Sequence, residues 1–149
     1  MLNKTSPVVL VIDDEPLMVR LLRVLLEDEG YTVFEAMTGP IGLALVPVIS
    51  PDVVVLDVMM PGMDGVEVCT RVAAGFPELP VIIVTARDDR ELEERCQAAG
   101  ARHFLTKPLA PGRLEELLRS LVCTPSVAEP ETPWKAEYPM ADYLPPAKI

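Results

Sequence analysis

The stretch VVLVIDDEP at residues 8–16 decides the fold class, because it joins an apolar run directly to three acidic residues. Five aliphatic residues in succession, without polar alternation, are typical of a strand that is buried on both faces. Pro16 then suits the first turn of a helix. The sequence therefore predicts a buried strand that is followed at once by acidic side chains and a helix.

The same strand-then-helix unit recurs five times along the chain. Strands are expected at 8–12, 32–36, 53–56, 81–84 and 103–106, and helices at 16–29, 38–49, 65–74, 89–99 and 113–122. Only the 38–49 segment is opposed by its own residues, because Gly42 and Pro47 both disfavour a regular helix. This alternation predicts a doubly wound α/β sandwich with a five-stranded parallel sheet, and right-handed crossovers leave few topologies for it.

Composition limits the classes of protein that remain. The net charge of -10 argues against direct nucleic-acid binding by this chain alone. The three cysteines (Cys69, Cys96 and Cys123) are an odd number without a CxxC pair, which favours reduced thiols over a disulfide framework. Prolines and aspartates interrupt the most apolar stretch, at 43–63, so no membrane span is expected. We expect a soluble, cytoplasmic protein.

The chain divides by composition into residues 1–122, which hold all five units, and residues 123–149. The second part contains six of the sixteen prolines and the only tryptophan. One interpretation is a linker to an output domain. The other is that Trp134 and Tyr138, four residues apart, anchor this tail on the domain or on a partner.

Polar residues stand at the carboxyl ends of four predicted strands. Asp13 and Asp14 follow the first, Asp57 follows the third, Thr85 ends the fourth, and Lys107 follows the fifth. In open parallel sheets this edge is where ligands bind. We expect the five side chains to converge in one shallow crevice.

Three carboxylates at short range repel one another, so at least one pKa rises unless a cation intervenes. Lys107 supplies only one positive charge. A divalent cation with oxygen ligands removes the excess, and Mg²⁺ suits a site that combines few carboxylates with waters and a phosphoryl oxygen. Asp57 is then placed to act as a nucleophile toward phosphorus, with Lys107 neutralising charge and the Thr85 hydroxyl donating a hydrogen bond.

These residues lie in motifs that resemble a known family. The segment VVLDVMMPGMDG at 54–65 is similar to the phosphoacceptor segment of bacterial response-regulator receiver domains. IDDE at 12–15, VTA at 84–86 and GARHFLTKPL at 100–109 resemble the other motifs of that family, in the same order. The resemblance covers about residues 7–122 and leaves the tail unexplained. It implies a flavodoxin-like sandwich with its five strands in the order 2-1-3-4-5.

The resemblance implies a role for each matching position. Asp57 would take a phosphoryl group from the phosphohistidine of a sensor histidine kinase, from a phosphotransfer protein or from a small phosphodonor. Asp14, Asp57 and the backbone carbonyl of Met59 would bind Mg²⁺ directly, and Asp13 mostly through water. Lys107 would contact the acyl phosphate. The chain would then be a phosphoacceptor and not an enzyme.

The family also implies a switch and a cis peptide bond. Thr85 would move toward the phosphoryl group, and Phe104 would rotate inward into the space that Thr85 leaves. The Lys107–Pro108 bond is expected to be cis. The helices at 89–99 and 113–122 would report the state, and this face could also serve a homodimer, although no distinctive pairing supports one.

Three alternatives remain to be weighed. A pseudo-receiver, a protein-interaction module on the same fold, would need no phosphorylation, but all the site positions carry competent residues. A phosphohydrolase would need an acid at position 59, where the chain has Met59. A flavin mononucleotide carrier would need a phosphate-cradling loop after the first strand, where DDEP stands. Because neither Met59 nor Arg87 carries a carboxylate or amide suited to orienting a hydrolytic water, we expect moderate to slow self-dephosphorylation.

Overall fold

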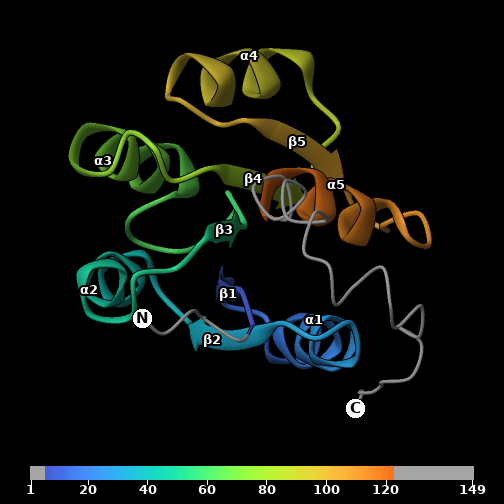
Figure 1. The fold of residues 1–149 in the computed structure, drawn as a ribbon. Coiled ribbons are helices and arrows are strands. Elements are labelled where there is room, and N and C mark those ends of the chain that lie inside the picture. Colours follow the sequence, from blue (N-terminus) through green and yellow to red (C-terminus); the bar gives the residue numbers. More distant parts are fainter. Residues whose placement is uncertain (1–5, 123–149) are drawn as a thin grey trace, which may run out of the picture.

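The computed structural model describes residues 6–122, which form a five-stranded parallel sheet in the order β2-β1-β3-β4-β5 (Figure 1). The strands are β1 (Val8–Ile12), β2 (Thr32–Ala36), β3 (Val53–Leu56), β4 (Val81–Thr85) and β5 (His103–Thr106). The helices are α1 (Pro16–Asp28), α2 (Gly39–Ile49), α3 (Gly65–Gly75), α4 (Arg90–Ala98) and α5 (Arg113–Val122). The predicted fold class and strand order are confirmed. The predicted tail at 123–149, with Trp134 and Tyr138, lies outside the described residues.

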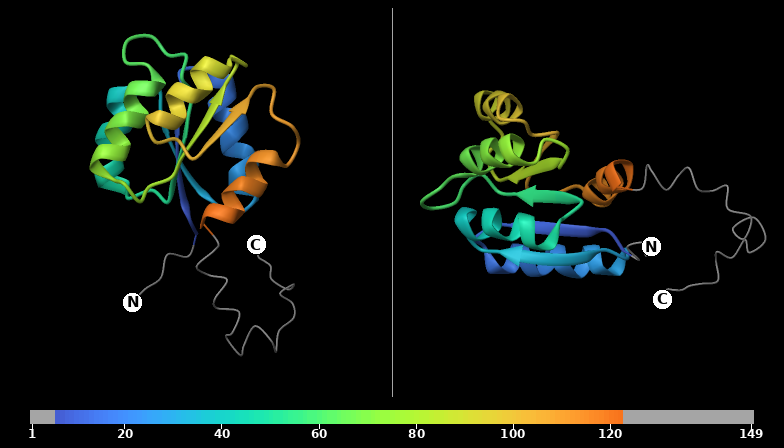
Figure 2. Two further views of the ribbon diagram at one scale, coloured as in Figure 1. Left: turned by 90° about the horizontal axis from the view of Figure 1, so that it is seen from above. Right: turned by 60° about the vertical axis from the view of Figure 1, so that its left-hand side comes forward.

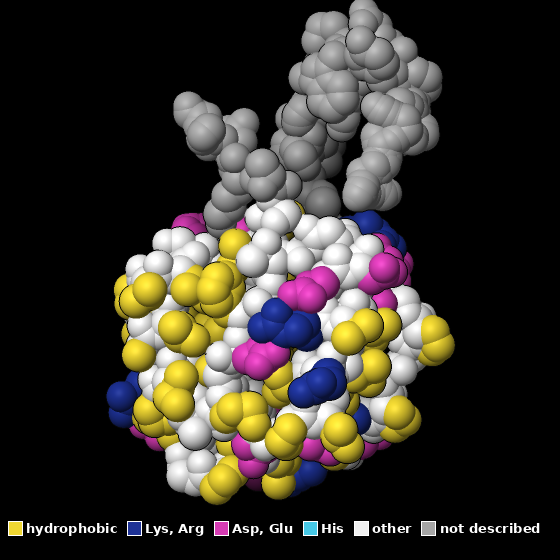
Figure 3. All heavy atoms as spheres, turned by 90° about the horizontal axis from the view of Figure 1, so that it is seen from below, with side chains coloured by type: hydrophobic (Ala, Val, Ile, Leu, Met, Phe, Trp, Pro, Cys, Tyr) yellow, Lys and Arg dark blue, Asp and Glu magenta, His cyan; other side chains and the backbone are white. Residues whose placement is uncertain are grey.

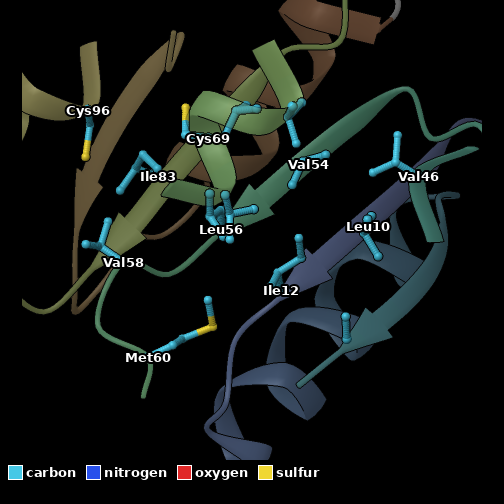
Figure 4. Packing of buried hydrophobic residues seen from close by; sticks show 14 of the residues in the cluster. Leu10, Ile12, Val46, Val54, Leu56, Val58, Met60, Cys69, Ile83 and Cys96 are labelled. Carbon is cyan, nitrogen blue, oxygen red and sulfur yellow. The ribbon is translucent and has the colours of Figure 1, made fainter. Parts of the chain in front are cut away.

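The helices cover the sheet in two layers (Figures 1 and 2). Side chains of α2, α3 and α4 pack with Leu10, Ile12, Leu56 and Ile83 into one buried cluster on the first face (Figure 4). Side chains of α1 and α5 pack on the other face against the alternate strand residues, which are Val9, Val11, Val53, Val55, Ile82 and Val84. This two-sided burial explains why the central strands contain no polar residue before their carboxyl ends.

Helix α2 forms although Gly42 and Pro47 oppose it. The Thr38 hydroxyl accepts a hydrogen bond from the Ile41 N–H (3.2 Å) and caps the first turn. Gly42 faces the Ile12 side chain so closely that a β-carbon there would overlap it. The glycine therefore allows close packing on β1, which offsets its weak helix propensity, and Pro47 lies on the exposed side.

The two cysteines among the described residues, Cys69 of α3 and Cys96 of α4, are buried free thiols. Burial raises the pKa of the Cys69 thiol to about 11. Between residues 6 and 122, no helix has both the length and the apolar character that crossing a membrane requires.

The register of the sheet places the polar residues that end or follow the strands at the same edge of the sheet. Ile12 pairs with Leu56, so the residues that follow them, Asp13 and Asp57, lie side by side. Thr85 pairs with Thr106, which places Lys107 beside the end of β4. The convergence predicted from the sequence thus follows from strand pairing.

Gly65, the first residue of α3, holds this helix against the loop after β3. A β-carbon at Gly65 would lie 2.5 Å from the Val58 Cα and 2.6 Å from the carbonyl oxygen of Asp57. Both neighbours are backbone atoms, so they cannot yield as a flexible side chain could.

We expect Gly65→Ala to lower the free energy of unfolding by about 1–3 kcal/mol, the usual range for an overpacked site. Gly75→Ala is the matched control, because it ends the same helix and a β-carbon there meets nothing within 4 Å. The control should change stability by about 1 kcal/mol or less, toward a more stable fold. Urea unfolding of both variants measures this difference, and equal values would contradict the role given to Gly65.

Candidate functional site

Three carboxylates meet beyond the ends of β1 and β3. Asp13 and Asp57 are buried, with 3% and 6% of their surfaces exposed, and Asp14 is half-buried. One ligand atom from each lies within 4.8 Å of the others. The backbone N–H of Asp13 donates to the Ala36 carbonyl (3.1 Å), and that of Asp57 donates to the Ile12 carbonyl (2.9 Å). These bonds continue the sheet and hold the carboxylates in place.

The ammonium group of Lys107 contacts the carboxylates of this cluster. The Nζ atom of Lys107 lies 3.2 Å from Oδ2 of Asp13, 3.6 Å from Oδ2 of Asp57 and 3.8 Å from Oε1 of Glu15. The Lys107 N–H donates to the Thr85 carbonyl (2.7 Å), which fixes the base of the lysine side chain. Although burial lowers the pKa of Lys107, the carboxylates of Asp57 and Asp13 outweigh it and raise that pKa. Lys107 therefore remains charged.

The positive charge near the Asp57 carboxylate is too small to offset its burial and its negative neighbours. Burial is the largest influence and raises its pKa, while the Met59 N–H, which donates to Oδ1 at 3.1 Å, lowers it. The Asp13 charge raises the pKa further, and Lys107 only partly opposes it. Together these influences raise the pKa of Asp57, so its ionised form is disfavoured until a further cation binds at the site.

The donor set suits a hard divalent cation. Three carboxylates supply only oxygen ligands, which Mg²⁺ prefers, and they leave room for waters. A crevice of about 450 Å³ opens over them, lined by Asp14, Glu15, Pro16, Asp57, Met59, Ala86 and Lys107. The site therefore offers both excess negative charge and space for a small phosphorylated group.

Two other predicted residues, Thr85 and Phe104, do not line this crevice. Thr85 is fully buried at the end of β4, and its hydroxyl oxygen accepts from the Arg87 N–H at 3.4 Å. Phe104 is half-buried and packs against the cluster shared by α3 and α4. The rotation expected for Phe104 stays a prediction. The Lys107–Pro108 bond is cis, as expected.

Two contributors were not singled out from the sequence. Glu15 reaches Lys107, and Gly65 fixes the loop that carries Asp57. The sequence indicated Glu15 as a neighbour of the site, because Glu15 directly follows Asp13 and Asp14. No local pattern distinguishes Gly65 from an ordinary helix start, since its role depends on contact with β3.

Comparison with known proteins gives the class of protein. Residues 9–119 match the family model of the response regulator receiver domain. The chain therefore belongs to the response regulator receiver domain family.

The chain is similar to several curated response regulators. It is 43% identical over 115 residues to the response regulator PleD of Caulobacter vibrioides, which covers 76% of this chain and 25% of that protein. It is 33% identical over 127 residues to the alkaline phosphatase synthesis transcriptional regulatory protein PhoP of Bacillus subtilis, covering 85% of this chain and 53% of that protein. The chain thus spans between a quarter and about half of these relatives.

Solved receiver structures share the fold. The chemotaxis protein CheY4 of Vibrio cholerae has a TM-score of 0.74 at 29% identity, covering 78% of this chain and 99% of that one. The response regulator TrrA of Thermotoga maritima, solved with Mg²⁺ and BeF, has a TM-score of 0.73 at 29% identity, covering 78% of this chain and all of that one. Each of these two receiver structures is matched over almost its whole length by this chain.

We expect Asp57→Asn to stabilise the metal-free protein and to abolish its stabilisation by Mg²⁺. A raised pKa in the folded state means that the contribution of Asp57 to stability is lost as pH rises through that pKa. At neutral pH the uncharged amide of the Asp57→Asn variant avoids this loss of stability. Saturation with Mg²⁺ at about 100 times its Kd should stabilise the unaltered chain by ~2.7 kcal/mol, and the variant much less.

Thermal or urea unfolding with and without Mg²⁺ measures both effects. Asp28→Asn is the matched control, because this exposed aspartate ends α1, outside the cluster. The control should keep the full response to Mg²⁺. If Asp57→Asn responds to Mg²⁺ as strongly as the control does, the cluster is not the metal site.

Proposed function

We propose that this chain is a cytoplasmic phosphoacceptor switch in a two-component phosphorelay. Asp57 takes a phosphoryl group from the phosphohistidine of a sensor histidine kinase or phosphotransfer protein, in the presence of Mg²⁺. The observation that carries this proposal is the buried Asp57 carboxylate, with a raised pKa, among two further aspartates and 3.6 Å from the Lys107 ammonium. Membership of the receiver family supports the same role.

The residues present can perform the transfer. One oxygen of Asp57 attacks phosphorus, a P–O bond forms, and the P–N bond of the donor phosphohistidine breaks with its electron pair going to the imidazole. The Met59 N–H holds Oδ1 of Asp57, while Oδ2 lies on the side of Lys107. Lys107 then neutralises charge on the phosphoryl oxygens.

The metal would be held by Asp14, Asp57 and the Met59 carbonyl, with Asp13 acting through water. When bound, Mg²⁺ supplies positive charge next to the transferring phosphoryl group. That charge also offsets the repulsion among the aspartates described above.

The switch would begin at Thr85. A phosphoryl group on Asp57 adds charge and acceptor oxygens, and the Thr85 hydroxyl can turn from the Arg87 N–H to donate to one of them. Phe104 would move into the space that Thr85 leaves. The surface of α4, β5 and α5 would report the change to a partner or a second copy.

A surface for the phosphodonor lies beside the crevice. Helix α1 begins at Pro16, which lines the crevice, and it exposes Leu17 (76%) and Val24 (59%). Hydrophobic side chains on α1 and α2 gather on the face seen in Figure 3, with charged side chains between them. Contiguous exposed apolar residues mark protein interaction surfaces. This helix therefore supports a protein donor.

The alternative is a phosphorylation-independent pseudo-receiver, which would bind partners through the same surfaces. The competent residues at positions 13, 14, 57, 85 and 107 disfavour it.

Incubation with acetyl phosphate and Mg²⁺ should add one phosphoryl group, read by intact mass. We expect Asp57→Asn to abolish the addition, because among residues 6–122 Asp57 is the carboxylate that contacts both the Met59 N–H and the Lys107 ammonium group. Lys107→Ala should slow it by about 10²-fold or more, the usual cost of one preorganised charge. Asp28→Asn serves as the control and should label as the unaltered chain does. Undiminished labelling of Asp57→Asn would refute the proposal.

The acyl phosphate should decay slowly, over minutes or longer. Met59 lines the crevice beside Asp57 but offers no group that orients water. Met59→Asn should therefore speed the loss of phosphate several-fold, while Met59→Leu, the matched control, should not. Decay within seconds in the unaltered chain would contradict this expectation.

A further inference from the structure

An apolar groove lies between α1 and α5, on the face of the sheet away from α3. Its volume is about 410 Å³. Leu21 and Leu25 of α1 line one side, Leu114 of α5 lines the other, and the loop from Pro108 to Gly112 closes one end. Glu115 is its single charged lining residue. A groove of this kind binds an apolar segment that brings few charges.

The described chain ends beside this groove. Helix α5 ends at Val122, and in its last turn Nη1 of Arg119 lies 3.7 Å from Oε1 of Glu29, just beyond the end of α1 (Figure 2). Because α1 and α5 belong to the same layer, the described chain ends on the face that holds the groove.

The residues that follow have the composition of a groove ligand. Residues 133–138 read PWKAEY and contain Trp134 and Tyr138. Tryptophan and tyrosine are the side chains that most often dominate binding energy at interfaces. Proline restricts the unbound chain, so less entropy is lost when the segment binds. The charges of Lys135 and Glu137 within the segment cancel, and Lys135 is complementary to Glu115 of the groove.

The segment is long enough to reach the groove and turn back. Trp134 follows Val122 by twelve residues, which span up to about 40 Å when extended. Helix α1 has 13 residues, a length of about 20 Å. Attachment also gives the segment an effective concentration on the order of millimolar, so even a weak contact would be populated.

We propose that the segment 133–138 binds in the groove between α1 and α5 of its own chain, with Trp134 against Leu21 and Leu25. A second copy is a weaker occupant, because each copy carries a net charge of -10 and the two would repel. The exposed apolar face of α2 offers side chains such as Val48, but the groove is the concave site in the layer where the described chain ends.

Fluorescence tests this proposal directly, because Trp134 is the only tryptophan in the chain. We expect its emission in the unaltered 149-residue chain to be blue-shifted and its acrylamide quenching to be several-fold weaker than in urea. Leu21→Glu should restore strong quenching, since the added charge enters the groove. Val48→Glu is the matched control, because Val48 is 75% exposed on α2, and it should leave the emission unchanged.

A second measurement does not depend on a groove variant. Trp134→Ala should change the leucine methyl resonances of Leu21 and Leu25 and leave those of Leu56, in the opposite face, unchanged. The proposal is overturned if Trp134 of the folded chain is quenched as strongly as in urea. It is also overturned if Val48→Glu alone exposes Trp134, or if shielding disappears on dilution, which would indicate a second copy.

Discussion

The structure depends on keeping mutually repelling carboxylates together with too little positive charge. Asp13 and Asp57 are almost fully buried, Asp14 adjoins them, and a single lysine contacts two of the three. Left to themselves, such groups would separate or take up protons. The sheet prevents separation, because both buried aspartates continue its backbone ladder. The remaining imbalance is expressed as the raised pKa of Asp57. Folding stability is thus given up at the place where a cation and a phosphoryl group can restore the balance.

This imbalance also explains why the surrounding structure is so apolar and closely packed. A flexible frame would let the carboxylates move apart, so the fold needs rigid strands that are held from both faces. The clusters on the two faces provide that support, and Gly65 brings α3 against the backbone at Asp57. Lys107, which follows the edge strand β5, brings its ammonium group to Asp13 and Asp57. The close packing of the two faces therefore holds the carboxylates at the distances that the chemistry requires.

Sequence patterns sufficed for the features that depend on neighbours along the chain. The bounds of β1 and β3 were predicted as observed, because these strands are uninterrupted apolar runs that end in polar residues. The bounds of β2 and β5, the two edge strands of mixed composition, were also predicted as observed. β4 extends one residue further, since Thr85 is buried within the strand although it is polar. The site followed from the rule that carboxyl ends of parallel strands meet at one edge. The contact of Glu15 with Lys107, the close approach at Gly65 and the groove between α1 and α5 could not be predicted, because each depends on how distant segments pack.

The antiparallel course of helices and strands has a further consequence for how such a domain can be joined to others. Strand β1 begins, and helix α5 ends, at the edge of the sheet opposite Asp57 (Figure 2). A fusion partner or an affinity tag attached at either end would thus sit behind the acceptor and leave its entrance free. Whatever is attached there lies at the edge of the sheet opposite Asp57, so it is not in direct contact with a phosphoryl group on that residue.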